Sequence, residues 1–194
     1  MGRIILVRHG ETQLNAEGVF FGIKDPTLNE KGKIQAEESK KTIEKLEYDK
    51  IYSSDLLRAL ETAEIINIKN MEIEKSQKLR ELNFGIFEGY KYNELKELYP
   101  EQLKKSEIDW KNYNYETGES VRELQERAVS FIEELDLEKN NLIVTHWGVI
   151  NTILSHYFST ELEGYWKFSV KNGGIVIIDF LDNFPILRGL NIGG

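Results

Sequence analysis

Two separate stretches of this 194-residue chain share one design, and this repeated design constrains the fold more than any other feature. Residues 4–7 and 142–145 are apolar or β-branched throughout, as expected for strands that are buried on both faces. The first stretch continues as Arg8-His9-Gly10 and the second as His146-Trp147-Gly148. Because ligands bind at the carboxyl ends of strands in parallel sheets, these histidines, two of the three in the chain, are expected to face a ligand.

The rest of the chain alternates strand-like and helix-like segments, which is the pattern of an α/β sheet. Further strands are expected at residues 50–53, 71–75, 175–180 and 185–190, the last two as a pair at one edge. Helices are expected at about residues 29–46, 54–67, 93–99, 119–135 and 149–158. We therefore expect one domain over residues 1–194, a three-layer α/β/α sandwich with a mostly parallel central sheet. A cap-like insertion is expected at about residues 84–115.

Two local predictions concern the first two helices. Ile34, Ile43 and Leu46 are expected on the buried face of the helix at 29–46, among many exposed lysines and glutamates. Ser54 is expected to cap the next helix, with Asp55 in its first turn, where a negative charge interacts favourably with the helix dipole.

Charge and composition argue against several classes of protein. Lysine and arginine number 25 against 33 acidic residues, so the net charge of −8 would repel a nucleic acid. The absence of cysteine rules out disulfides, thiolate metal sites and a cysteine nucleophile. No apolar stretch reaches the roughly 18 residues of a membrane span, and the apolar run at the amino terminus is too short for a signal peptide. We therefore expect a cytoplasmic protein with no nucleic-acid or membrane partner; no feature indicates an oligomeric state.

Each candidate site residue also has a purely structural interpretation. A single histidine at a strand end is often a hydrogen-bonded structural residue, but two of them, one beside Arg8, favour a functional site. Arg58, in the first turn of a predicted helix, is either solvated or joins the helix amides in holding a phosphate. Glu81, in Leu79-Arg80-Glu81-Leu82, is either a surface carboxylate or an acid–base group.

These residues belong to a longer series of segments that resembles the histidine phosphatase superfamily, which includes the cofactor-dependent phosphoglycerate mutases. Its signature is matched by Leu6-Val7-Arg8-His9-Gly10-Glu11-Thr12. Further matching segments follow in the family's order: Asn15, Phe20-Phe21-Gly22, Asp25, Tyr52-Ser53-Ser54-Asp55-Leu56-Leu57-Arg58-Ala59, Glu61-Thr62-Ala63, Leu79-Arg80-Glu81, Gly118-Glu119-Ser120 and Val144-Thr145-His146-Trp147-Gly148. The resemblance therefore covers residues 4 to about 150.

The resemblance implies a catalytic role for five residues. His9 would attack phosphorus and form a phosphohistidine, while Arg8, Arg58 and His146 would surround the transferred phosphoryl group. Glu81 would protonate the leaving alkoxide and then activate water. The remaining substrate contacts would come from Asn15, Phe21, Gly22, Trp147 and Gly148. No metal or cofactor is implied, because arginines and histidines supply the positive charge; a zinc site on the two histidines stays conceivable, although Arg8 would oppose a dication.

Three departures from the mutases favour hydrolysis over phosphoryl re-donation. The chain is shorter than those mutases, and Tyr92 stands where they carry a lysine. Between Leu82 and Tyr115 there is no arginine, whereas the mutases use an adjacent pair in that region. We therefore predict a phosphatase; phosphoglycerate mutase activity and a non-catalytic module that binds a phosphorylated ligand remain the alternatives.

The substrate is expected to be a small phosphorylated metabolite. Residues 79–89, Trp110 and Gly118-Glu119-Ser120 resemble the short bacterial members, which include α-ribazole-5'-phosphate phosphatases of cobalamin biosynthesis and broad-specificity phosphomonoesterases. Eight aromatic residues between 84 and 115 could stack on an aromatic leaving group, or could anchor that segment to the core. We predict α-ribazole-5'-phosphate as the substrate, with broad specificity as the alternative.

Overall fold

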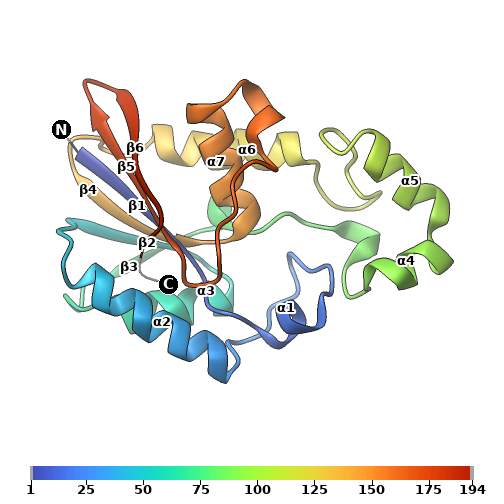
Figure 1. The fold of residues 1–194 in the computed structure, drawn as a ribbon, viewed down its shortest axis with the longest axis horizontal. Helices are drawn as coiled ribbons and strands as arrows, with labels where there is room; N and C mark the ends of the chain where they lie inside the picture. The colour runs from blue at the N-terminus through green and yellow to red at the C-terminus, as the bar shows by residue number, and fades with distance from the viewer. Residues whose placement is uncertain (1, 193–194) are drawn as a thin grey trace.

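The centre of the molecule is a six-stranded sheet (Figure 1). Its strands are β1 (Gly2–Arg8), β2 (Lys50–Ser54), β3 (Ile73–Ser76), β4 (Asn140–Thr145), β5 (Ile175–Leu181) and β6 (Phe184–Ile192). Their order in the sheet is β3-β2-β4-β1-β5-β6, in which the first four strands are parallel and the last two run antiparallel as a hairpin at one edge. The structure, a computed structural model, describes residues 2–192.

Helices cover both faces of this sheet. They are α1 (Gln13–Glu17), α2 (Glu30–Ile43), α3 (Leu57–Ile66), α4 (Tyr92–Leu98), α5 (Pro100–Ile108), α6 (Val121–Glu133) and α7 (Trp147–Phe158). Helices α2 and α3 lie on one face, α6 and α7 lie on the other, and α4 and α5 lie to one side of these layers (Figure 1). Within residues 2–192, none of the helices has the length and apolarity needed to cross a lipid bilayer.

The alternation of side chains along β1 explains the three layers. Ile4 and Leu6 pack into the core beneath α6 and α7, whereas Ile5 and Val7 pack into the separate core beneath α2 and α3. All four side chains are fully buried. Burying an apolar side chain of this size stabilises a fold by about 1.5–3 kcal/mol, so a strand that is apolar on both sides is stable only between two helical layers. The predicted three-layer α/β/α sandwich with a mostly parallel sheet is confirmed.

The parallel register brings three strand ends to the same place. Arg8 at the end of β1 lies opposite Thr145 at the end of β4, and Val144 lies opposite Ser53 in β2. The residues that follow these strands are therefore neighbours in space although they are far apart in the sequence.

Two local predictions were wrong, and one helix of the 84–115 segment was missed. Ile34 is 60% exposed, because α2 turns its small residues toward the protein, including Gly32, Ala36 and Ser39. Ser54 does not cap a helix: it ends β2, and the first amide of α3, at Leu57, donates instead to Asp25 Oδ1 at 2.6 Å. The second helix of the 84–115 segment, α5, was not predicted; it begins at Pro100, directly after α4.

Candidate active site

His9 follows β1 and is only 3% exposed. Its Nδ1 lies 2.6 Å from the carbonyl oxygen of Gly10. A carbonyl oxygen can only accept a hydrogen bond, so Nδ1 carries the proton and the lone pair of the ring stays on Nε2. Burial lowers the pKa of His9 well below its usual range, and the nearby charges of Arg58 and Arg8 lower this pKa further. His9 is therefore neutral at pH 7, with a nitrogen free to act as a nucleophile.

His146 follows β4 and is the N-cap residue of α7, and its ring centre lies 5.0 Å from that of His9. Its Nε2 is 2.9 Å from Ser54 Oγ, which also accepts the amide of Leu56 at 3.4 Å. When the Ser54 hydroxyl donates its proton to Nε2, the imidazole proton lies on Nδ1. This buried Nδ1 has no hydrogen-bond partner within residues 2–192, and burial followed by the charge of Arg58 lowers the pKa of His146.

Arg58, which is buried, and Arg8, which is half-buried, supply the positive charge of the site. Arg58 is fully buried in the first turn of α3, and its guanidinium donates to the carbonyls of Gly22 at 2.8 Å and Lys24 at 2.9 Å. Arg8 donates to the carbonyl of Val170 at 2.7 Å. Burial lowers the pKa of each arginine to about 10, so both stay charged at pH 7.

Neither guanidinium is fully satisfied by the protein. The Nε of Arg8 and the Nε of Arg58 are buried and have no partner in the part of the chain that the structure describes. The nearest carboxylate to Arg58 is that of Asp25, at 4.0 Å. Buried charges and donors of this kind are costly unless a partner completes them, so the cluster of Arg8, Arg58, His9 and His146 has the chemistry of an anion site.

The loop before α2 supports Arg58. The ring of Phe21 lies 4.8 Å from the Arg58 guanidinium, in a cation–π contact. The Gly22 amide donates to Glu88 Oε1 at 2.6 Å, and a Cβ at Gly22 would lie 1.7 Å from the carbonyl oxygen of Leu82. Two of the expected substrate contacts are therefore engaged within the protein: Phe21 with Arg58, and the Gly22 amide with Glu88.

Asn15 lies in α1, and its amide oxygen is used locally. The oxygen accepts the backbone N–H of Thr12 at 3.0 Å, which forms a capping box at the start of α1. The expected role of Asn15 as a donor to the substrate would fall to its amide nitrogen.

Glu81 is held at the start of α7. Its Oε2 accepts the amide of Gly148 at 3.1 Å, and its Oε1 accepts the amide of Leu82 at 2.8 Å. The charge of Glu81 favours the charged forms of Arg8 and Arg58, which shows that this carboxylate belongs to the same cluster. The Cβ of any larger residue at 148 would lie 2.3 Å from Glu81 Oε1, so this contact requires glycine.

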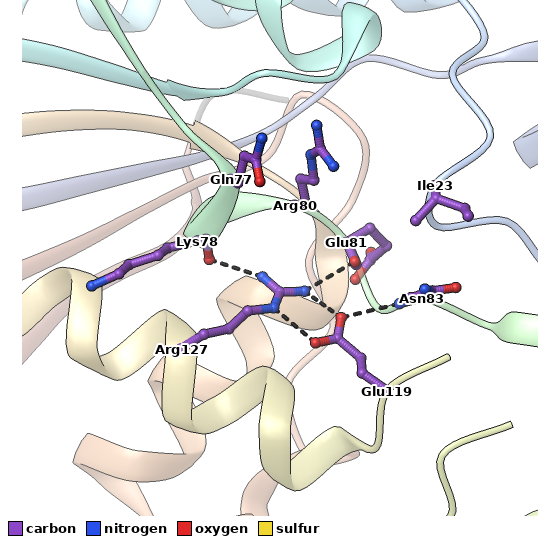
Figure 2. A pocket seen from close by; sticks show the side chains of 8 residues that line it. All are labelled: Ile23, Gln77, Lys78, Arg80, Glu81, Asn83, Glu119 and Arg127. Carbon is purple, nitrogen blue, oxygen red and sulfur yellow. Dashed lines mark hydrogen bonds and ion pairs between the residues drawn. The ribbon is translucent and has the colours of Figure 1, made fainter. Parts of the chain in front are cut away.

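Glu81 also borders two pockets of different character. The polar one has a volume of about 340 Å³, and Figure 2 shows its lining: Ile23, Gln77, Lys78, Arg80, Glu81, Asn83, Glu119 and Arg127. The other has a volume of about 230 Å³ and is largely aromatic, lined by Phe20, Glu81, Leu82, Phe84, Trp110, Tyr115, Val121, Trp147, Tyr165 and Trp166. The expected site residue Trp147 thus faces the aromatic pocket.

The aromatic residues at 84–115 divide between the core and the lining of a pocket, and Tyr115 belongs to both. Phe87 is buried against Tyr99, Tyr113 and Tyr115, which anchors the segment to the core. Phe84, Trp110 and Tyr115 line the aromatic pocket.

Sequence reasoning missed several residues of the site. Tyr165 and Trp166 complete the aromatic pocket from a turn after α7. The two neighbouring aromatic residues in the sequence were the signal that could have indicated an aromatic site. Ser54 was expected to cap a helix, whereas its hydroxyl contacts His146. A side-chain contact between two distant segments leaves no local pattern in the sequence. Within residues 2–192, no three His, Asp or Glu side chains are grouped so that they could hold a metal ion.

Comparison with known proteins agrees with this geometry. Residues 4–193 match the model of the histidine phosphatase superfamily (branch 1). The chain belongs to the histidine phosphatase superfamily. Relatives named as phosphatases match it over nearly its whole length, so it is an enzyme of the phosphoric monoester hydrolase type, as the sequence predicted.

Three relatives illustrate the range within this superfamily. Phosphoserine phosphatase 1 of Hydrogenobacter thermophilus is 30% identical, over 99% of this chain and 93% of the relative. The adenosylcobalamin/alpha-ribazole phosphatase of Salmonella typhimurium is also 30% identical, over 97% of this chain and 96% of the relative. The crystal structure of the alpha-ribazole phosphatase from Shigella flexneri superposes with a TM-score of 0.92 at 28% identity, covering 99% of this chain and 97% of that one.

Proposed function

We propose that this phosphatase is a metal-independent phosphomonoesterase that works through a phosphohistidine on His9. The observation that carries this proposal is the state of His9: a neutral imidazole with its lone pair fixed on Nε2, beside two guanidinium groups whose buried Nε donors lack partners within residues 2–192. A phosphoryl group provides both the electrophile that Nε2 needs and the anion that the arginines need.

In the first step, Nε2 of His9 attacks phosphorus while the bond between phosphorus and the ester oxygen breaks. Glu81, in its acid form, gives its proton to the leaving oxygen. Arg8, Arg58 and the Nδ1–H of His146 donate to the equatorial oxygens, where charge accumulates in the transition state. The products of this step are the free alcohol, the Glu81 carboxylate and phosphorylated His9.

In the second step, the Glu81 carboxylate removes a proton from water, and the water oxygen attacks the same phosphorus. The bond between phosphorus and Nε2 breaks, inorganic phosphate leaves and neutral His9 is restored. Glu81 is again protonated, so it alternates between acid and base in one cycle. Because its carboxylate lies beside Arg8 and Arg58, it is close to the phosphoryl group in both steps.

We propose α-ribazole-5'-phosphate as the substrate. The aromatic pocket borders Glu81, which is where the leaving group must lie, and its rings can stack on a benzimidazole. Its lining includes no lysine, arginine or histidine. The carboxylate of phosphoserine, or a second phosphate, would therefore find no cation there. The residues at about 84–115, which supply Phe84, Trp110 and Tyr115, act in this proposal as a cap over the leaving group.

The test is phosphate release with EDTA present, from α-ribazole-5'-phosphate, phosphoserine, p-nitrophenyl phosphate, 3-phosphoglycerate, fructose-2,6-bisphosphate and nucleotides. We expect kcat/KM for α-ribazole-5'-phosphate to exceed the others by at least about 100-fold, because its apolar benzimidazole suits the aromatic pocket better than the more polar bases of nucleotides or a single nitrophenyl ring. A flat profile would overturn the substrate and leave a broad-specificity phosphatase. Isomerisation of 3-phosphoglycerate without phosphate release would overturn the hydrolytic reaction itself.

A further inference from the structure

Arg127 reaches the backbone around Glu81 although the proposed reaction makes no use of it (Figure 2). It projects from α6, and its Nη1 donates to the carbonyl oxygen of Lys78 at 2.8 Å. Its Nη2 donates to the carbonyl oxygen of Glu81 itself at 3.0 Å. One side chain therefore fixes two points of the segment that carries Glu81.

Glu119 extends this contact to the other side of Glu81. Its carboxylate accepts Arg127 Nε at 2.8 Å and forms a second hydrogen bond with Nη2, so the pair is bidentate. The same carboxylate accepts the amide of Asn83 at 3.1 Å, and the amide of Glu119 donates to the carbonyl oxygen of Asn83 at 3.0 Å. Both residues of the pair are largely shielded from solvent, with side chains 22% and 19% exposed.

The residues beside Glu119 fix its own position. A Cβ at Gly118 would lie 2.1 Å from the carbonyl oxygen of Asn83, so only glycine permits this close approach. Ser120 caps α6, because its Oγ accepts the Glu123 amide at 3.2 Å while the Glu123 carboxylate accepts the Ser120 amide at 2.7 Å. The Gly118-Glu119-Ser120 segment thus connects the beginning of α6 to the backbone next to Glu81.

The segment from 80 to 84 depends on such contacts because it forms neither helix nor strand. Its backbone groups have no ladder of regular hydrogen bonds to hold them, and Arg127 and Glu119 satisfy several of them instead. A general acid works only when its oxygen lies within hydrogen-bond reach of the leaving group, and small displacements are costly to the rate.

We infer that Arg127 and Glu119 are positioning residues that hold Glu81 where it can protonate the leaving group. The inference rests on the proposed function, in which Glu81 is that acid. Neither residue is expected to contact the substrate, and their effect on the reaction passes through the backbone of residues 78–83.

The test compares a substrate that needs an acid with one that does not. An alkyl phosphate such as glycerol 2-phosphate has a poor leaving group, whereas p-nitrophenolate leaves without protonation. For Arg127→Gln we expect kcat/KM, which reports the steps up to phosphohistidine formation, to fall about 10- to 100-fold on the alkyl ester. On p-nitrophenyl phosphate it should fall less than about threefold. In a Glu81→Gln background, Arg127→Gln should add almost no further loss, because the group that it positions is already absent.

Lys78→Met is the matched control. Lys78 lines the same pocket and also contacts α6, where its Nζ donates to Ser130 Oγ at 3.1 Å and to Glu134 at 2.6 Å. These hydrogen bonds of the Lys78 side chain involve neither Glu81 nor Glu119. The variant should therefore keep the wild-type ratio of kcat/KM between the two substrates. Glu119→Gln, which keeps the shape of the side chain and loses its charge, carries the test if Arg127→Gln does not fold, as judged from its melting curve.

Two results would overturn the inference and leave a purely structural ion pair. One is an equal loss of kcat/KM on both substrates in Arg127→Gln. The other is a loss in the double variant that equals the product of the losses in Arg127→Gln and Glu81→Gln. If Glu81→Gln itself showed no dependence on the leaving group, the proposed role of Glu81 would fall instead. The two failures are therefore distinguishable.

Discussion

At the scale of single residues, the proposed reaction depends on keeping His9 neutral among positively charged side chains. The surrounding arginines that hold a phosphoryl group also oppose a proton on His9, and burial acts in the same direction. The carbonyl of Gly10 then selects which nitrogen keeps the lone pair. In the proposed mechanism, one environment thus prepares both the nucleophile and the group that it attacks.

Glu81→Gln tests the acid directly. The amide cannot donate a proton to a departing alkoxide, so we expect kcat/KM for alkyl phosphates to fall by about 100-fold or more, and that for p-nitrophenyl phosphate far less. Stopped-flow or steady-state kinetics with both esters provide the measurement. Equal losses on the two esters would remove Glu81 from this role.

The resemblance to a known family predicted the groups of this cluster, but not the way in which the protein holds them. Arg8, His9, Arg58, Glu81 and His146 could be named because each stands in a recognisable segment, and the structure brings these five together. The partners that orient them, such as Ser54 for His146, are contacts between distant elements. No local pattern encodes such a contact, so a structure is needed to find it.

At the scale of elements, the start of α7 holds the Glu81 carboxylate and packs tightly against it. Gly148 is needed there because its amide donates to Glu81 and because no Cβ fits beside that carboxylate. The same Cβ would lie 3.1 Å from Leu124 Cδ2 and 3.2 Å from the Tyr165 hydroxyl, so the space is restricted on several sides.

For Gly148→Ala we therefore expect Glu81 to be displaced while the fold survives, because the closest atom belongs to the end of a flexible side chain. Activity on alkyl phosphates should fall by about tenfold or more, with a smaller change in melting temperature than a core substitution gives. The control is His156→Ala, at an exposed position of the same helix. Wild-type kinetics for Gly148→Ala would contradict this account of the contact.

Periodicity and capping signals predicted the long elements better than the short ones. Helix α6 was expected from its apolar stripe, and the structure adds a capping box at Ser120. The same reasoning wrongly placed Ile34 on the buried face of α2. This helix packs closely against the protein and therefore buries small residues rather than large ones. In the 84–115 segment, α5 carries many charged residues and too weak a pattern to be recognised.

At the scale of the whole molecule, an acidic chain of net charge −8 encloses a cationic site. The site can form because the carboxyl ends of β1, β2 and β4 lie side by side. Residues from both helical layers complete its walls. The burial that lowers the pKa of His9 and His146 also couples the stability of the fold to pH.

Stability should fall as the pH decreases below about 6.5, the pKa of histidine in an unfolded chain. Below that pH the unfolded chain takes up protons on His9 and His146 while the folded chain does not, whereas above it both states are neutral. Each histidine contributes a slope of up to about 1.4 kcal/mol per pH unit to the free energy of unfolding. Urea unfolding between pH 7.5 and 5.5 in phosphate-free buffer measures this slope of the free energy of unfolding against pH.

His146→Gln should reduce that slope, and His156→Gln, which removes an exposed imidazole, is the control. An unchanged slope in His146→Gln would show that the buried imidazole does not titrate on unfolding as we infer from its pKa.

The central claim is that His9 carries the phosphoryl group during turnover. The most direct measurement is rapid quenching of the enzyme with ³²P-labelled substrate in the presence of EDTA. We predict label on the protein that is stable in base and labile in acid, as expected for phosphohistidine, and no label on folded His9→Ala. Phosphate release by the wild type with no such label, or label and turnover that persist in His9→Ala, would contradict the account.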